Sequence, residues 1–436
     1  MALGGGTWTQ QDKVLPGAYI NFSSAVKADS GLSERGIVAV PLALSWGPEK
    51  EVIELKADTA SSAVKTLLGY DYGDSHMTAI RELFKNASKL YCYRINSNAV
   101  KASNSYATAT YGGVRGNDIK IAIAVNADNE NRFDVSTYVG DELADRQMNV
   151  AAADLKDNPW VSFKREAFLA AAAATPLTGG TDGGDISGAD YTGFLAAVES
   201  YGFNTLCCPS ADAEISGLFT AFTKRLCEES GANFQTVCYK PADADYEGVI
   251  GVWNPVTGLP EYGLVYWVAG AEAACPIGAS LTNRVYDGEL AVDTQFTQDA
   301  LKDAVEAGKL VLHSINGIPH VLEDINSLIS FTGTKTEDFR YNQTIRVLSG
   351  AANDIAAAFK EKYLGRVPNN QDGRISLWND ICKVMERYRK AGAIEPFDTG
   401  NVEVLPGESK KAVVCNIKNL SVVSAMSVLY MSVVIA

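Results

Sequence analysis

The sequence predicts an α/β core with a mostly parallel, helix-covered sheet, an inserted small β domain, a C-terminal α+β domain and extended N- and C-terminal strand arms. Strand-like and helix-like runs alternate, with short connections, in residues 23–95 and again in 190–335. This order is typical of a parallel sheet, so we expect the two segments to form one discontinuous core. Short runs between turn residues predict a β domain and linker over 96–180. We expect an N-terminal arm at 1–22, a C-terminal helical domain at 336–410 and a C-terminal strand arm at 411–436.

Chain length, net charge and cysteine content limit the possible classes of protein. A chain of 436 residues exceeds the size of one core, so two to four domains are expected. Its net charge of −14 argues against coating nucleic acid. Eight scattered cysteines without metal-ligand spacing, and no basic-then-apolar signal after Met1, favour synthesis in a cytosol.

The first segment is predicted to be a loose leader followed by a short strand. Residues 1–15 contain three consecutive glycines and then polar side chains. Pro16 and Gly17 form a turn signal. The strand 18–22 follows, and we expect its residues Tyr19, Ile20 and Phe22 to pair with another strand.

The core elements follow in order. Residues 36–44 and 90–94 are strand-like, and 77–85 are amphipathic. The β domain is expected to contain strands at 119–125, 132–139 and 160–163 and to end at an alanine run, and the glycine-rich stretch 177–184 is typical of a linker. In the second core segment we expect helices at 194–201, 215–230, 262–275 and 301–307, and strands at 203–208, 234–238, 248–253 and 310–313.

Two helices are predicted in the C-terminal domain, at 342–363 and 375–389. In the second helix Trp378, Ile381, Met385 and Tyr388 share one face.

The opposite face of this helix carries Lys383, Arg387 and Lys390, which give an acidic protein a local basic stripe. The stripe is either an ordinary solvated face or a docking surface for an acidic partner.

The last residues are rich in β-branched and aromatic side chains. Residues 413–417 and 426–436 are strand-like, and the second run is apolar on both alternating faces. It can complete its own sheet or a neighbour's sheet, and we expect an assembly strand. A tail anchor over 419–436 is the remaining alternative, although serines interrupt that span. The candidate inter-subunit residues here are Val413, Val414, Ile417, Leu429, Tyr430, Met431, Val433 and Val434.

Patterns typical of enzymes are missing from the sequence. Gly308-Lys309 is followed by Leu310, so there is no phosphate-binding P-loop, and neither a dinucleotide fingerprint nor a nucleophile elbow occurs. The only histidines, His76, His313 and His320, are too dispersed to predict a metal site. We therefore expect no catalytic residues, no metal and no cofactor, with an α/β enzyme whose site no short motif reveals as the alternative.

Several stretches, in the same order along the chain, resemble the tail sheath protein of contractile phage tails of Gram-positive myophages and defective prophages. They are KVLPGAYINF at 13–22, ERGIVAVPLALSWGP at 34–48, YGGVRGNDI at 111–119, LTGGTDG at 177–183, AGAEA at 269–273 with SLTN at 280–283, and YMSVV at 430–434. Each motif is weak alone, and their shared order makes the set specific.

The resemblance implies a subunit that polymerises in stacked rings around an inner tail tube and contracts to drive the tube through a cell envelope. It implies arm exchange through residues 1–22 and 411–436. It also places the C-terminal domain nearest the tube, which favours Lys383, Arg387 and Lys390 as the tube-facing residues. Implied partners are the chain itself, the tube protein, and baseplate and tail terminator proteins, without nucleic acid or membrane insertion. The implied location is the virion tail, assembled in the host bacterial cytoplasm.

Overall fold

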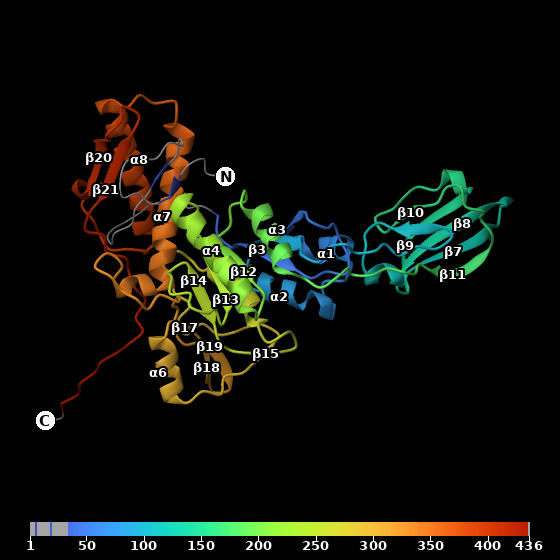
Figure 1. The fold of residues 1–436 in the computed structure, drawn as a ribbon, viewed down its shortest axis with the longest axis horizontal. Helices are drawn as coiled ribbons and strands as arrows, with labels where there is room; N and C mark the ends of the chain where they lie inside the picture. The colour runs from blue at the N-terminus through green and yellow to red at the C-terminus, as the bar shows by residue number, and fades with distance from the viewer. Residues whose placement is uncertain (1–4, 7–17, 20–33, 435–436) are drawn as a thin grey trace. The chain divides into compact units, whose positions relative to one another are not determined.

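The computed structural model describes residues 5–6, 18–19 and 34–434. Its contacts divide the chain into two compact units, which are described separately. Unit 1 is formed by segments within 1–39, 79–89 and 199–436, and unit 2 by 40–78 and 90–198. Figure 1 shows the elements of each.

A parallel sheet forms the centre of unit 1. Its strands are short, apolar and buried, as expected for a sheet that is covered on both faces. Each neighbouring pair is parallel, with registers such as Cys207 beside Val237 and Val237 beside Ile250. The order is β17 (Lys309–Leu310), β14 (Val249–Val252), β13 (Gln235–Tyr239), β12 (Thr205–Cys208) and the start of β3 (Ile37–Leu42).

Helices cover the two faces of this sheet. Thr205 on β12 donates to Ala269 O on α5 (Leu264–Ala274) at 2.8 Å, whereas Thr236 on β13 contacts Thr223 on α4 (Ala213–Glu229). Thr236 is in register with Leu206, which follows Thr205 in β12. Because successive strand residues point to opposite faces, Thr205 and Thr236 lie on opposite faces of the sheet. Helices α5 and α4, which they contact, therefore cover opposite faces. Unit 1 also contains β1 (Gly5–Gly6), β2 (Ala18–Tyr19), α2 (Thr78–Phe84), β15 (Val256–Thr257), β16 (Ala291–Val292), α6 (Gln298–Glu306), β18 (Leu312–Ile315) and β19 (Ile318–Val321).

The C-terminal part of unit 1 is a pair of packed helices with a β hairpin. Helix α7 (Asn342–Lys362) packs on α8 (Gln371–Lys390), and Tyr388 OH donates to Asp354 on α7 at 3.0 Å. The Asn370 side chain caps α8 by accepting from Gly373 N. Strands β20 (Val402–Pro406) and β21 (Val413–Ile417) pair antiparallel, and β20 packs on α8 (Figure 1).

Unit 2 contains an antiparallel β domain. One sheet has the order β11 (Ala172–Pro176), β7 (Ile119–Asn126), β8 (Asn129–Val139) and β9 (Glu142–Val150), and a smaller one pairs β10 (Val161–Phe163) with β6 (Ala107–Ala109). Their shared core includes Trp46 and Trp160, whose rings lie 5.2 Å apart. The rest of unit 2 comprises the end of β3, β4 (Val52–Lys56), α1 (Ala60–Leu68), β5 (Lys89–Arg94) and α3 (Gly188–Val198).

Three stretches that carry the family resemblance meet inside unit 2. Asp182 accepts from Ser45 Oγ at 2.9 Å and from Val114 N at 2.8 Å. The buried Arg94 guanidinium donates to Gly47 O and Gly112 O, both at 2.8 Å. The 177–183 stretch, expected to be a linker, is therefore hydrogen-bonded into the unit.

Most predicted elements are present, with ends shifted by a few residues. Helix α1 and strand β9 were not predicted, and neither were the short strands β1, β4, β6, β15, β16, β19 and β20. The alanine run expected to end the β domain is the edge strand β11. The prediction of a strand over 426–436 is not met in the single chain, because the described residues 426–434 form no regular structure.

Candidate assembly site

The C-terminal arm begins with strands that pair within their own chain. In β21, Val414 is opposite Leu405 and Ile417 is opposite Val402 of β20. Val413 and Ile417 are half-buried and pack in a cluster with Ile381 and Met385 of α8. Three predicted inter-subunit residues, Val413, Val414 and Ile417, thus belong to a hairpin that anchors the arm on its own helix.

The next segment lies along the C-terminal helices. Val422 forms a bridge with Ile394, and Val423 N donates to Ala393 O at 3.0 Å. Ala425 N then donates to the Gln343 side chain on α7 at 3.0 Å.

Beyond Ala425, the arm is exposed. Leu429 is 85% exposed, Tyr430 92% and Val434 91%. Met431 and Val433 are exposed as well, so all five predicted residues of this run point into solvent. Fully burying one large apolar side chain is worth about 1.5–3 kcal/mol, so this segment is suited to association with another surface.

The N-terminal arm is described only in part. Tyr19 lies in β2, which pairs in parallel with β1, and Gly6 is the register partner of Tyr19. Strand β1 contacts α4, and β2 contacts α7. Pro16, Gly17, Ile20 and Phe22 lie outside the described residues.

The predicted basic stripe lies on α8, whose buried face contains Leu377, Ile381, Met385 and Tyr388. Trp378, expected on that face, is half-buried, and its indole donates to Val402 O at 2.9 Å.

On the other side of α8, Lys383 and Lys390 are exposed, and Arg387 is half-buried. Lys383 Nζ lies 2.9 Å from Asp380 Oδ1, so this carboxylate offsets one charge of the stripe.

Asp380 is a strong acceptor on the surface of the helix pair. Lys362 and Lys383 both contact its carboxylate at 2.9 Å, and Tyr363 OH donates to it at 3.0 Å. Partial burial would raise the pKa of Asp380, but these hydrogen bonds outweigh burial and lower the pKa to about 2. The carboxylate is therefore ionised at neutral pH.

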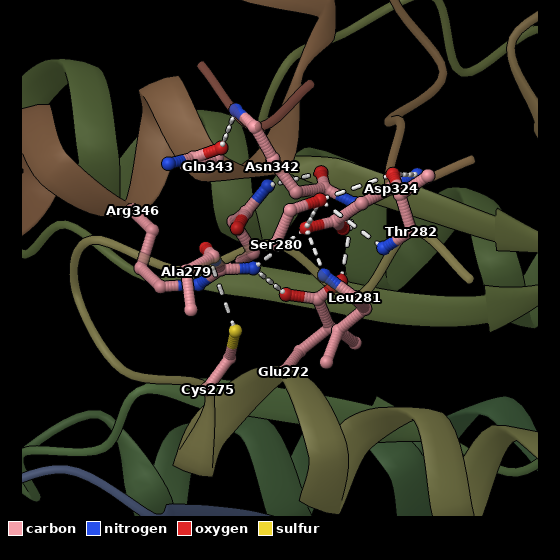
Figure 2. A network of polar contacts seen from close by, with 12 residues as sticks. Glu272, Cys275, Ala279, Ser280, Leu281, Thr282, Asp324, Asn342, Gln343 and Arg346 are labelled. Carbon is pink, nitrogen blue, oxygen red and sulfur yellow. Dashed lines mark hydrogen bonds and ion pairs between the residues drawn. The ribbon is translucent and has the colours of Figure 1, made fainter. Parts of the chain in front are cut away.

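A buried polar cluster joins α5, α7 and the loop after β19. We define it as Glu272, Asp324, Asn342 and Arg346 (Figure 2). Arg346 Nη2 lies 2.5 Å from Glu272 Oε2 and 3.1 Å from Asp324 Oδ2. Asn342 Nδ2 donates to Asp324 Oδ1 at 2.9 Å and to Glu272 Oε1 at 3.2 Å. The contacts fasten the start of α7 to the α/β core.

The two carboxyl groups of this cluster titrate in opposite directions. Burial raises the pKa of Glu272 well above its usual range. Burial alone would raise the pKa of Asp324. The charge of Arg346 and the hydrogen bonds from Leu281 N and the Asn342 side chain together outweigh burial and lower the pKa of Asp324. Glu272 is therefore the carboxyl that binds a proton more readily.

The sequence prediction missed this cluster. Glu272 is the one charged residue in the predicted apolar helix 262–275. A lone charge in such a helix indicates a buried partner. Glu272 could thus have been found from the sequence. Asp324 and Arg346 could not, because their neighbours in the sequence include other polar residues.

The described residues contain neither a metal-ligand cluster nor a membrane-spanning helix. Over 34–434 and the short described N-terminal segments, no group of three or more His, Cys, Asp or Glu is placed to hold a metal ion. In the same part of the chain, every helix is too short or too polar to cross a bilayer.

Comparisons with known proteins cover nearly the whole chain. Residues 35–95 match the tail sheath protein Gp18 domain III N-terminal region, and 96–182 the phage tail sheath protein beta-sandwich domain. Residues 184–327 match the phage tail sheath protein central domain, and 334–436 the phage tail sheath C-terminal domain.

Individual proteins agree with these matches. The phage-like element PBSX protein XkdK of Bacillus subtilis is 32% identical, over 91% of this chain and 92% of its own length. The crystal structure of the sheath tail protein from Desulfitobacterium hafniense is 36% identical with a TM-score of 0.81, covering 93% of this chain and 98% of that one. The contracted helical sheath of the anti-feeding prophage shares the fold at 14% identity, with a TM-score of 0.54 over 97% of this chain and 99% of that one.

The fold and these matches define a structural protein of phage tails rather than an enzyme. The chain belongs to the phage tail sheath protein family.

Proposed function

We propose that the chain is the subunit of a contractile tail sheath that polymerises around an inner tube by exchanging its terminal arms. The observation that carries the proposal is the arm itself: 413–425 is held on the subunit, whereas 426–434 presents large apolar side chains to solvent. A segment of this kind can add as a strand to the edge of a sheet in a neighbouring copy.

The hairpin β20–β21 is the proposed acceptor. It is a sheet of only two strands among the described residues, so each strand keeps an outer edge. Strand addition there satisfies backbone donors and acceptors of both partners, and such main-chain pairing is retained when the subunits rotate as rigid bodies.

The other partners follow from this assignment. The 336–410 domain faces the inner tube through Lys383, Arg387 and Lys390. Baseplate and tail terminator proteins contact the ends of the sheath. The sheath is part of the virion tail and assembles in the host cytoplasm.

Contraction in this proposal uses no nucleotide. The free energy is the difference between two packings of the same subunits, and a few kcal/mol for each subunit suffices in a cooperative lattice.

Negative-stain microscopy of the purified protein tests the proposal. The full chain should form striated tubes, and a variant lacking 424–436 should remain folded and unassembled. Circular dichroism of the truncated variant is the control for folding. Tubes of normal length from the truncated variant would exclude the arm exchange.

A further inference from the structure

One buried side chain holds the point at which the C-terminal arm leaves the subunit. Gln343, in the first turn of α7, is only 4% exposed. Its Oε1 accepts from Ala425 N at 3.0 Å, and its Nε2 donates to Gly278 O at 3.1 Å. Both ends of the amide are therefore engaged, one with the arm and one with the body.

Ala425 lies at the boundary between the held and the exposed parts of the arm. The preceding residues are fixed by the Val422–Ile394 bridge and by the hydrogen bond from Val423 N to Ala393 O. The following residues, 426–434, are exposed and irregular. The hydrogen bond between Gln343 and Ala425 is thus positioned where it can set the direction of residues 426–434.

The backbone of Gln343 is held in place by its neighbour. Asn342 contributes its side chain to the buried polar cluster (Figure 2). Its Oδ1 also accepts from Gln235 Nε2 on β13 at 2.9 Å. Because the start of α7 is fixed to the core in this way, Gln343 has little freedom to follow a moving arm.

A second segment, just before β3, is bound to the end of α5. Arg35, two residues before β3, donates to Cys275 O and Glu272 O, both at 3.1 Å. Arg35 therefore binds the same end of α5 as the cluster that supports Gln343.

We propose that Gln343 is the positioning residue of the C-terminal arm: it fixes the exit direction of 426–434 through Ala425 and transfers load from the arm to the buried polar cluster. An amide with two directional hydrogen bonds specifies an orientation, which an apolar contact of the same size does not. The role of the arm in assembly is taken from the proposed function, whereas the contact itself exists in the unassembled chain.

Amide hydrogen exchange of the unassembled protein gives the first test. In the unchanged protein, Ala425 N should exchange more slowly than the amides of 427–434. Substitution Gln343→Met keeps the size and removes both hydrogen bonds, and should speed exchange at Ala425 about fivefold, the scale of one hydrogen bond. The exposed Gln298→Met on α6 is the matched control and should have no effect.

The amide data can overturn the inference even if the variant does not fold. If Ala425 in the unchanged protein exchanges as fast as 427–434, the contact does not hold the arm and the inference is wrong.

Assembly gives the second test. Gln343→Met, if folded, should form tubes that are shorter or irregular compared with those of Gln298→Met. Normal tubes from Gln343→Met overturn the positioning role but leave arm exchange intact, because arm exchange is tested separately by the 424–436 deletion. Normal tubes from the deletion overturn the proposed function, whatever the exchange at Ala425.

Discussion

Arg346 and Glu272 form an ion pair in which each side chain is only 1% exposed. Because Asp324 contacts the same guanidinium, two buried carboxyl groups depend on one cation.

Substitution Arg346→Met should therefore destabilise the protein strongly, by about 3–5 kcal/mol, because it leaves buried carboxyl groups without their partner. Glu272→Gln is the comparison variant: it replaces the carboxyl group by an amide of the same size and leaves the Arg346–Asp324 pair, so its effect should be smaller. Urea unfolding of both variants measures the difference. Equal effects would contradict the account of the cluster.

The second prediction concerns acid stability at Asp380. Its folded-state pKa of about 2 lies below the ordinary value of 3.8, so the ionised form stabilises the fold above that ordinary value. This stabilisation is lost as pH falls through the folded pKa. Asp380→Asn should thus destabilise the protein at pH 6, by about 1–2 kcal/mol, and the difference from the unchanged protein should vanish near pH 2. Urea unfolding at a series of pH values checks the trend, and a difference independent of pH would contradict it.

The third prediction concerns a glycine in the YGGVRGNDI stretch. Gly113 has φ +137°, and an added Cβ would lie 1.9 Å from Ser45 O. Gly113→Ala must strain the backbone and move the 45–47 segment, so we expect a loss of about 2 kcal/mol or more. Gly184→Ala, where a Cβ meets nothing within 4 Å, is the matched control. Thermal unfolding should separate the two variants, and similar melting temperatures would show that the close approach is not required.

The fourth prediction concerns the basic stripe. Replacing Lys383, Arg387 and Lys390 together by Gln should weaken binding to the purified inner tube protein, and added salt should weaken the unchanged protein's binding in the same direction. The exposed Lys302 on α6 gives the control variant Lys302→Gln. Co-sedimentation with tubes is the measurement. Normal recovery of the triple variant would mean that the stripe is only a solvated face.

Much of the fold could be predicted from local pattern. The buried strands β12 to β14 are short apolar runs, and α8 shows its periodicity plainly. Strand β9 was missed because its sequence, ELADRQMNV, is that of an exposed edge strand and carries three charged residues. Strand β11 was missed because alanine does not favour a strand by itself.

The candidate site was predicted unevenly for a similar reason. The apolar run at 426–434 can be recognised in the sequence because its residues are contiguous. The buried polar cluster is not, since Glu272 and Arg346 are 74 residues apart and only the fold brings them together. The part of the arm that is held, 413–425, could not be separated by pattern from the part that is exposed, because both are rich in valine.

The exposed run beyond Ala425 has a consequence for the free subunit. The side chains of Leu429, Tyr430 and Val434 are exposed to solvent until a second chain covers them. Newly made subunits should therefore associate through these side chains, and increasingly so as the protein concentration rises. Under the proposed function, the order in which the tail components are made then matters, because sheath subunits made before the tube would form aberrant polymers.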